Sequence, residues 1–227
     1  MSTEKILNRK DLKQPDEFIS GTEKFLKYCS ENKTITIGSI ATVVLLALAF
    51  WGYSYNRDKQ MQQMESLLFE MKQIGLDSDK KPSEMTSSYE NFLKNFAEGP
   101  QKNRAKLLLA DQYFRSSQPE KSEKIYRELM SQSKPSELIY DFAELGLGYS
   151  LELAKNLKDA VSVFKTLIAR DGQSPLFQAY MSLARIYDAD KDSKNALLIL
   201  REMENKFPKH SEFGVIQDKI AALEKRA

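Results

Sequence analysis

Two kinds of hydrophobic pattern divide the chain. Residues 34–56 carry no charged side chain, and Ile35–Tyr53 form an apolar span of 19 residues. After Tyr55, apolar residues recur every three or four positions up to the C-terminus, which is the period of amphipathic helices. The breaks between the periodic segments contain Gly, Pro, Ser and Asp, and no segment alternates as a β-strand does. The sequence therefore predicts an all-α protein, with a single N-terminal transmembrane helix followed by a solenoid of helical hairpins.

The apolar span has the length that a bilayer requires. As a helix it would cover about 28 Å, close to the thickness of the hydrocarbon core. Aromatic side chains gather at its C-terminal end, where they favour the headgroup layer. A cleaved signal peptide is the competing interpretation, because Ala47-Leu48-Ala49 has cleavage-like spacing, but Phe50-Trp51 follows where a polar region is expected. We expect an uncleaved anchor over residues 34–55, with the membrane-facing positions Ile35, Gly38, Val44, Leu46, Trp51 and Tyr53.

The charges beside the span give a weak preference for one orientation. Lys24, Lys27 and Lys33 precede it, whereas Arg57 and Lys59 follow it. Because the more basic side usually stays inside, we expect residues 1–33 in the cytoplasm and residues 56–227 outside it. The single cysteine, Cys29, then lies on the inner side, which agrees with an oxidising compartment for the large domain.

The N-terminal arm combines an irregular part with one predicted helix. Residues 1–14 show no period, and Pro15-Asp16-Glu17 is typical of a helix start. Two interpretations stay open: a helix lying on the headgroups, which we favour, or a docking helix for a membrane partner. The apolar face consists of Phe18, Ile19, Thr22, Phe25, Leu26 and Cys29.

The helical part contains repeated units whose corresponding residues stand 36 and 38 positions apart. The clearest unit has Tyr180, Leu183, Ala184, Tyr187, Ala196, Leu200, Met203 and Pro208, and an earlier one has Phe142, Leu145, Gly146, Tyr149, Ala160, Phe164 and Leu167. A weaker copy has Ala110, Tyr113, Ser122, Tyr126, Leu129 and Pro135. These spacings resemble the tetratricopeptide repeat, in which a small residue lets two helices approach and neighbouring hairpins stack into one core. A divergent first hairpin is expected over 56–74 and 83–98, and a capping helix over 211–226.

Composition removes most kinds of chemistry. The chain has 34 Lys and Arg against 32 Asp and Glu, so the net charge of +2 gives no support for nucleic-acid binding. With one His and one Cys, and no Gly-rich loop, we predict no catalytic residues, no cofactor and no metal site, and therefore no enzyme. Asp188, Asp190 and Asp192 begin like a calcium loop, but Ser193 replaces the turn glycine, so a helix-capping role is preferred.

A concave groove lined by the first helix of each hairpin is the predicted partner site. Aromatic, Met and Arg side chains there suit an extended polypeptide. For Leu147 and Leu151 burial by the neighbouring repeat is an equally good interpretation, as is edge packing for Tyr140. The groove residues are Phe114, Arg115, Tyr140, Leu147, Leu151, Met181 and Arg185.

The complete layout resembles a known family of membrane proteins. It consists of a short arm with Phe25-Leu26-Lys27-Tyr28, one span, and repeats to the end of the chain. This order is similar to the bacterial ancillary SecYEG translocon subunits, the YfgM-like bitopic inner-membrane proteins. The resemblance implies a cytoplasmic N-terminus, a periplasmic domain, and as partners the SecYEG channel, periplasmic chaperones or exported clients. Association into homo-oligomers is a separate expectation that stays open. The alternatives are a scaffold for another envelope assembly, division or secretion complex, and a cleaved secreted repeat protein.

Overall fold

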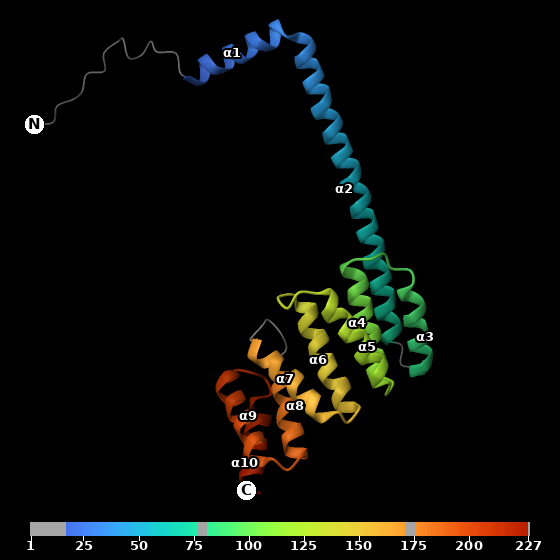
Figure 1. Ribbon diagram of the computed structural model, residues 1–227, viewed down its shortest axis with the longest axis vertical. Coiled ribbons are helices and arrows are strands. Elements are labelled where there is room, and N and C mark those ends of the chain that lie inside the picture. Colours follow the sequence, from blue (N-terminus) through green and yellow to red (C-terminus); the bar gives the residue numbers. More distant parts are fainter. Residues whose placement is uncertain (1–16, 77–80, 171–175, 227) are drawn as a thin grey trace, which may run out of the picture. The chain divides into compact units, whose positions relative to one another are not determined.

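The computed structural model describes residues 17–76, 81–170 and 176–226, with side chains from Gly21 onward. Within these ranges every regular element is an α-helix. The chain divides into two compact units, Met1–Met61 and Gln62–Ala227. The predicted fold, a long apolar helix followed by packed helical hairpins, is confirmed (Figure 1).

The first unit contains α1 (Glu17–Glu31) and the start of α2 (Lys33–Leu76). Residues 1–14, the predicted helix start at Pro15-Asp16, and the side chains of Phe18 and Ile19 lie outside the described residues. Asn32 separates the two helices, and its backbone N–H still bonds to the Tyr28 carbonyl at 2.9 Å. The predicted helix in the arm is therefore present, and Phe25 and Leu26 on it are exposed.

The N-terminal part of α2 has the length and composition of a membrane span. Its large apolar side chains are exposed, including the predicted anchor positions Ile35, Val44, Leu46, Trp51 and Tyr53, and Gly38 has open space around it. The hydroxyls of Thr36, Ser39 and Thr42 donate to backbone carbonyls four residues earlier, at 2.9–3.0 Å. Because these polar groups are satisfied within the helix, they add little cost in lipid.

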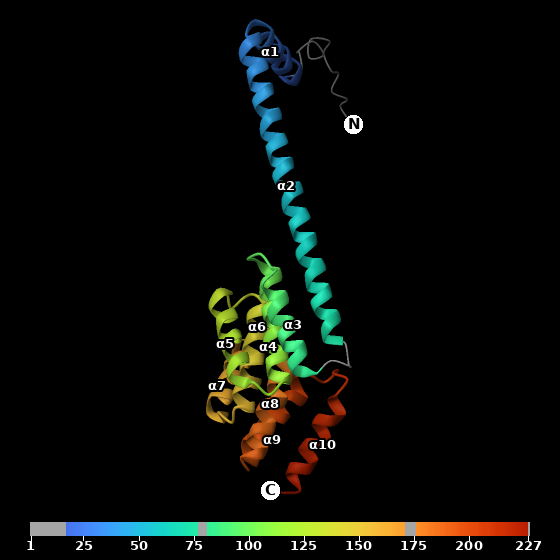
Figure 2. The same ribbon diagram turned by 90° about the vertical axis from the view of Figure 1, so that its right-hand side faces the viewer.

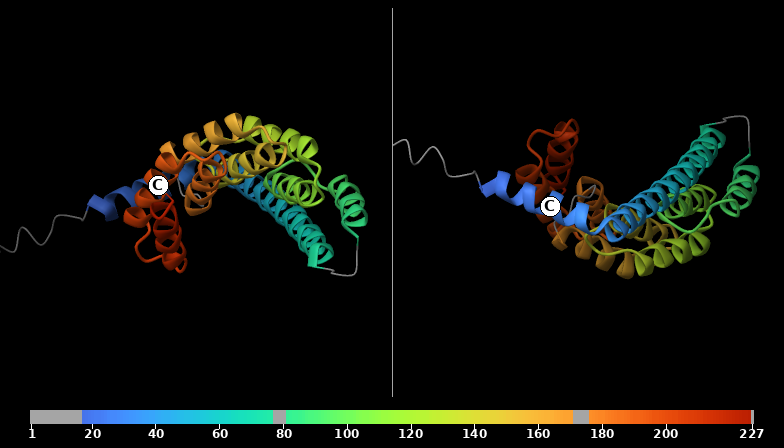
Figure 3. Two further views of the ribbon diagram at one scale, coloured as in Figure 1. Left: turned by 90° about the horizontal axis from the view of Figure 1, so that it is seen from below. Right: turned by 90° about the horizontal axis from the view of Figure 1, so that it is seen from above.

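The second unit is a series of helical hairpins. The end of α2 contacts α3 (Pro82–Leu93) through side chains, and α3 packs on α4 (Pro100–Arg115). Three closely packed hairpins follow: α4 with α5 (Pro119–Gln132), α6 (Leu138–Leu153) with α7 (Leu157–Arg170), and α8 (Leu176–Ala189) with α9 (Ser193–Lys206). The last helix, α10 (Phe213–Glu224), packs on α9. Within this unit the hairpins follow one another along a curve, and α10 lies at its end (Figures 2 and 3).

The same turn joins the two helices of three consecutive hairpins. Ser117, Lys155 and Lys191 have φ values of 56°, 63° and 62°, and each precedes a helix. The next backbone N–H in each turn bonds to a carbonyl five residues earlier, at 2.8–2.9 Å. In the last copy Asp192 also accepts a hydrogen bond from the Asn195 N–H at 3.1 Å. The capping role predicted for Asp192 is confirmed, while Asp188 lies 3.4 Å from the Arg226 guanidinium.

The repeat positions of the second helices form the core as expected, whereas Phe142 on the first helix of its unit is exposed. The second helices of the three units bury Ser122, Tyr126, Leu129, Ala160, Phe164, Leu167, Ala196, Leu200 and Met203. On α10, Ile216, Ile220 and Leu223 are buried, and Phe213 packs against the same core. A separate cluster joins the end of α2 to α3 and α4 through Leu68, Met71, Tyr89, Phe96 and Leu109. The first hairpin is therefore attached through its own small core.

Candidate functional site

An apolar pocket of about 530 Å³ lies between the N-terminal halves of α4 and α6. Helix α4 contributes Pro100 and Leu107, and α6 contributes Leu138, Ile139 and Phe142. Gly99, Asn103, Arg104 and Glu137 complete the lining. A pocket with mostly apolar walls and a few polar groups at its edge is the usual form of a ligand-binding site.

The walls of this pocket include large apolar side chains that the fold leaves in contact with solvent. Leu138 is 48% exposed and Phe142 is 39% exposed. Helix α6 already buries Ala143, Leu145 and Leu147 in the main core, so it carries more apolar surface than one core face can cover. Neighbouring exposed apolar side chains beside a cavity indicate a surface that another molecule covers.

The charges around the pocket nearly cancel. The Arg104 Nη1 atom lies 3.3 Å from the Glu65 Oε1 atom on α2, and the Gln101 amide donates to the same oxygen at 3.3 Å. Glu137 adds one negative charge at the edge. The Arg104 side chain is 61% exposed, so this ion pair contributes little to stability. The pocket therefore combines apolar walls with little net charge at its edge.

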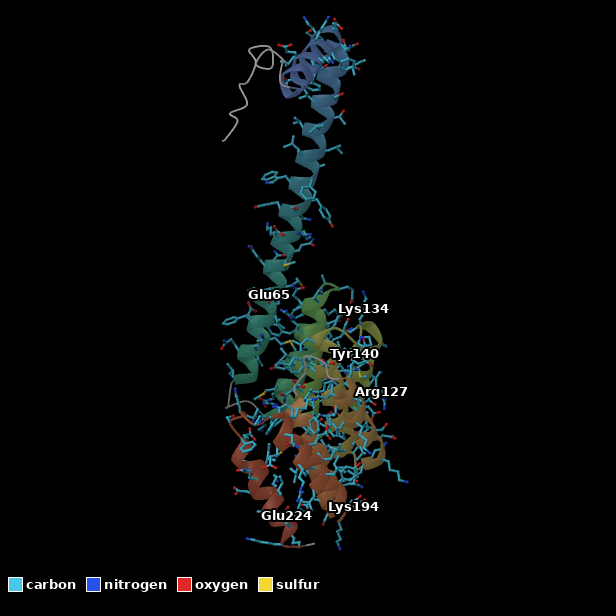
Figure 4. The ribbon with its side chains drawn as sticks, turned by 90° about the vertical axis from the view of Figure 1, so that its left-hand side faces the viewer. Glu65, Arg127, Lys134, Tyr140, Lys194 and Glu224 are labelled. Carbon is cyan, nitrogen blue, oxygen red and sulfur yellow. The ribbon has the colours of Figure 1, made fainter. Side chains whose placement is uncertain are left out.

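A buried charge cluster fixes the part of α6 that forms the pocket wall. The Arg170 guanidinium of α7 donates to the Asp141 carboxylate at 2.8 Å and also to the Glu144 carboxylate. Both carboxylate side chains are only 4% exposed. Burial raises the pKa of Glu144, and the hydrogen bond from Arg170 only partly opposes this effect. The Arg170 guanidinium also lies over the ring of Tyr140, 4.7 Å from the ring centroid (Tyr140 is labelled in Figure 4).

The structure places two of the predicted groove residues in the core. Leu147 and Leu151 are 2% and 1% exposed, because the neighbouring hairpins cover that side of α6. They offer no side-chain surface to a partner, and the competing interpretation of burial holds for them. Tyr140 is half-buried beneath Arg170. Phe114 is also half-buried, with its ring 6.0 Å from the Tyr149 ring on α6.

The remaining predicted groove residues lie apart from the α4–α6 pocket. Arg185 donates twice to the Glu152 carboxylate, at 2.9 and 2.7 Å, so α6 and α8 are joined there. Met181 and Arg185 line a smaller pocket between α8 and α10, whereas Arg115 is exposed at the end of α4. A single groove through these residues stays a prediction.

The α4–α6 pocket was not predicted, because the repeat pattern assigned Phe142 to the core and did not include Leu138. Phe142 occupies the first aromatic position of its repeat, which normally packs between helices, and Leu138 precedes the repeat pattern. One signal was present in the sequence. The segment Leu138-Ile139-Tyr140-Asp141-Phe142 has four apolar or aromatic residues in five, more than an amphipathic helix needs for one buried face.

His210, the one histidine of the chain, packs and bonds within the fold. The His210 ring stacks on Phe177 with 3.7 Å between centroids, and its Nδ1 atom accepts the Glu212 N–H at 3.2 Å. In residues 17–76, 81–170 and 176–226 no three His, Cys, Asp or Glu side chains gather in a metal-binding group. The described site is thus suited to recognition through apolar contacts.

Comparison with protein families gives one match. The sequence pattern of the tetratricopeptide repeat-like domain matches residues 27–169, from α1 to the end of α7. This range includes the apolar span as well as the hairpins that form the pocket. Individually characterised proteins give no significant match to the chain.

Proposed function

The chain belongs to the tetratricopeptide repeat-like domain family, and from this premise we propose that it is a non-enzymatic, membrane-anchored adaptor that binds other proteins. Members of this family are typically scaffolds without catalytic activity. The observation that carries the proposal is the α4–α6 pocket, whose exposed leucine and phenylalanine suit an apolar polypeptide segment. The ligand class is a short stretch of unfolded or extended chain with large apolar side chains.

Three segments would divide the work in this proposal. Residues 1–33 form a cytoplasmic arm, residues 34–55 cross the membrane, and residues 56–227 form a periplasmic repeat domain. Support for an anchor comes from α2, which continues from the apolar stretch to Leu68 and Met71 in the core of the first hairpin. The family pattern also begins before the span. An anchored domain would meet its ligands at a high effective concentration, so that weak pocket contacts suffice.

The complex that we propose for this adaptor is the SecYEG translocon. The support is the order of arm, span and repeat domain, which is that of ancillary translocon subunits. In this role the pocket would hold emerging apolar segments of exported proteins and pass them to periplasmic chaperones. The physical requirement is a binding site that is apolar and open enough to release its ligand, as the half-exposed walls of the α4–α6 pocket are.

Replacing Leu138 with aspartate is expected to weaken peptide binding about tenfold, because a buried leucine contact contributes roughly 1.5–3 kcal/mol. The full-length protein in lipid nanodiscs is titrated with a fluorescent Gly/Ser-rich peptide that carries one Phe-Leu-Phe stretch. Leu138 is the first residue of α6, where an acidic side chain is favourable, so the fold is expected to persist.

Leu198→Asp is the matched control for this titration. Leu198 is 63% exposed on α9 and does not line the pocket, so the same substitution there is expected to leave the affinity unchanged. Equal weakening by both substitutions, or by neither, would exclude the α4–α6 pocket as the binding site.

A further inference from the structure

A second, smaller pocket of about 90 Å³ lies between α8, α9 and α10. Its apolar floor is made of small and medium side chains, which include Met181, Ala184 and Leu200. Three cations surround this floor, Arg185 from α8, Lys219 from α10 and Arg226 just after α10, and the single carboxylate of Asp188 also lines it. The pocket has room for a short side chain and carries an excess of positive charge.

The three cations differ in how strongly they are already paired. Arg185 is held by two hydrogen bonds from its guanidinium to Glu152, and this pairing raises its pKa although burial opposes the change. Arg226 has a longer contact of 3.4 Å with Asp188, and its Nε–H donates to the Ala222 carbonyl at 3.2 Å. The side chains of Arg226 and Asp188 are both exposed. Lys219 makes no hydrogen bond or ion pair with any residue that the structure describes. An incoming carboxylate would thus meet one unpaired and one weakly paired cation.

We propose that this pocket between α8 and α10 binds the carboxylate of an aspartate or glutamate side chain in the polypeptide that the adaptor holds. The occupant follows from charge complementarity, because Arg185 is paired with Glu152 and the two other cations, Lys219 and Arg226, face the single carboxylate of Asp188. Lys219 and Arg226 donate to the carboxylate, and Arg226 exchanges its exposed contact with Asp188 for a better one, which costs little. Ala184, Leu200 and Ala222 exclude water from one side and so strengthen these interactions. An internal acidic residue fits better than a chain end, because the proposed ligand is a segment of extended chain.

This inference rests on the proposed function and makes the ligand more specific. A preferred segment combines large apolar side chains for the α4–α6 pocket with an acidic residue for the α8–α10 pocket. Neither contact is strong alone, and a single chain that occupies both gains by effective concentration.

The test measures the affinity of the full-length protein in nanodiscs for three peptides, two with an amidated C-terminus and one with a free C-terminal carboxylate. The first carries Phe-Leu-Phe, a flexible Gly/Ser spacer that can span any separation of the pockets, and a pair of glutamates. The second has glutamines in place of the glutamates, and both of these are amidated. The third has the glutamines and a free C-terminal carboxylate. We expect the glutamate peptide to bind about tenfold more tightly than the glutamine peptide at low salt, with the advantage shrinking at high salt.

Lys219→Gln should remove the preference for the glutamate peptide. The control is Lys194→Gln, which changes an exposed lysine in the first turn of α9 and should keep the preference. Equal binding of the two amidated peptides, both weakened by Leu138→Asp, would overturn the acidic subsite and leave the apolar pocket intact. Tight binding of the third peptide would assign the pocket to a chain end and overturn the proposal. If no peptide binds, the proposed function and this inference both fail.

Discussion

Arg170→Met is expected to destabilise the repeat domain by about 3–5 kcal/mol at pH 7, because it leaves two buried carboxylates without a cation. Asp141 and Glu144 have side chains that are 4% exposed, and Arg170 donates to both. Methionine keeps the apolar stem of the side chain, so the lost stability measures the effect of removing the guanidinium charge and its hydrogen bonds. The same substitution removes the cation above the Tyr140 ring and loosens the start of α6.

The pH dependence of this variant has a defined sign. Burial raises the pKa of Glu144 in the folded protein above its value in the unfolded chain. A group of this kind favours folding below its unfolded pKa, and that contribution is lost as the pH rises through the folded pKa. Without Arg170 the pKa of Glu144 rises further, so the deficit should be largest at neutral pH and shrink toward pH 4.5. Chemical denaturation at several pH values measures the change.

Arg127→Met provides the matched control. Arg127 donates to Glu123 at 2.8 Å on the surface of α5, and such a pair contributes no more than about 0.5 kcal/mol. Adding Glu144→Gln to Arg170→Met should restore part of the loss. If Arg170→Met costs no more than Arg127→Met, the cluster does not fix α6 as described.

Gly146→Ala is expected to lower the free energy of unfolding by about 2 kcal/mol, although alanine is the better helix former by about 1 kcal/mol. A Cβ atom at this position would lie 2.3 Å from the Tyr126 ring. That ring is 1% exposed, and its hydroxyl donates to the Asp111 carboxylate at 2.6 Å. A shift of the ring would therefore also disturb the hydrogen bond that Asp111 accepts.

Thermal unfolding is expected to show a decrease of about 4–8 °C for Gly146→Ala, since 1 kcal/mol corresponds to about 2–4 °C in a domain of this size. Gly214→Ala is the control, because no atom lies within 4 Å of the added Cβ on α10. It should leave the melting temperature unchanged or raise it. Similar effects of the two alanines would show that Gly146 is not needed for the approach of α5 to α6.

The fold was largely predictable because local patterns and tertiary packing agree in the second helix of each hairpin. Ala160, Phe164 and Leu167 fall on one face at helical spacing, and all three are fully buried. The first helices are harder to assign from spacing. Leu147 and Leu151 lie at positions that could face either a groove or the next hairpin. They are buried because neighbouring hairpins stack on that side of α6, which the spacing alone does not show.

The pocket was beyond prediction from sequence for a related reason. Its walls come from Pro100 and Leu107 on one hairpin and Leu138 and Phe142 on the next, and the space between them depends on how these hairpins meet. The turns show the opposite case. Lys155 and Lys191 adopt positive φ although they are not glycine, so residue type does not predict these turns. Each turn is instead stabilised by the hydrogen bond from the next backbone N–H to a carbonyl five residues earlier.

Site-specific photocrosslinking in native membranes is the sharpest test of the proposal that the membrane-anchored repeat domain binds polypeptide in the α4–α6 pocket. A photoreactive residue replaces Leu138 in one full-length variant and Leu198 in another, and the captured chains are identified. If the proposal holds, we expect position 138 to crosslink to apolar segments of SecYEG subunits, periplasmic chaperones or exported proteins, and position 198 to give few crosslinks. Equal capture from both positions, or capture of cytoplasmic proteins alone, would contradict it.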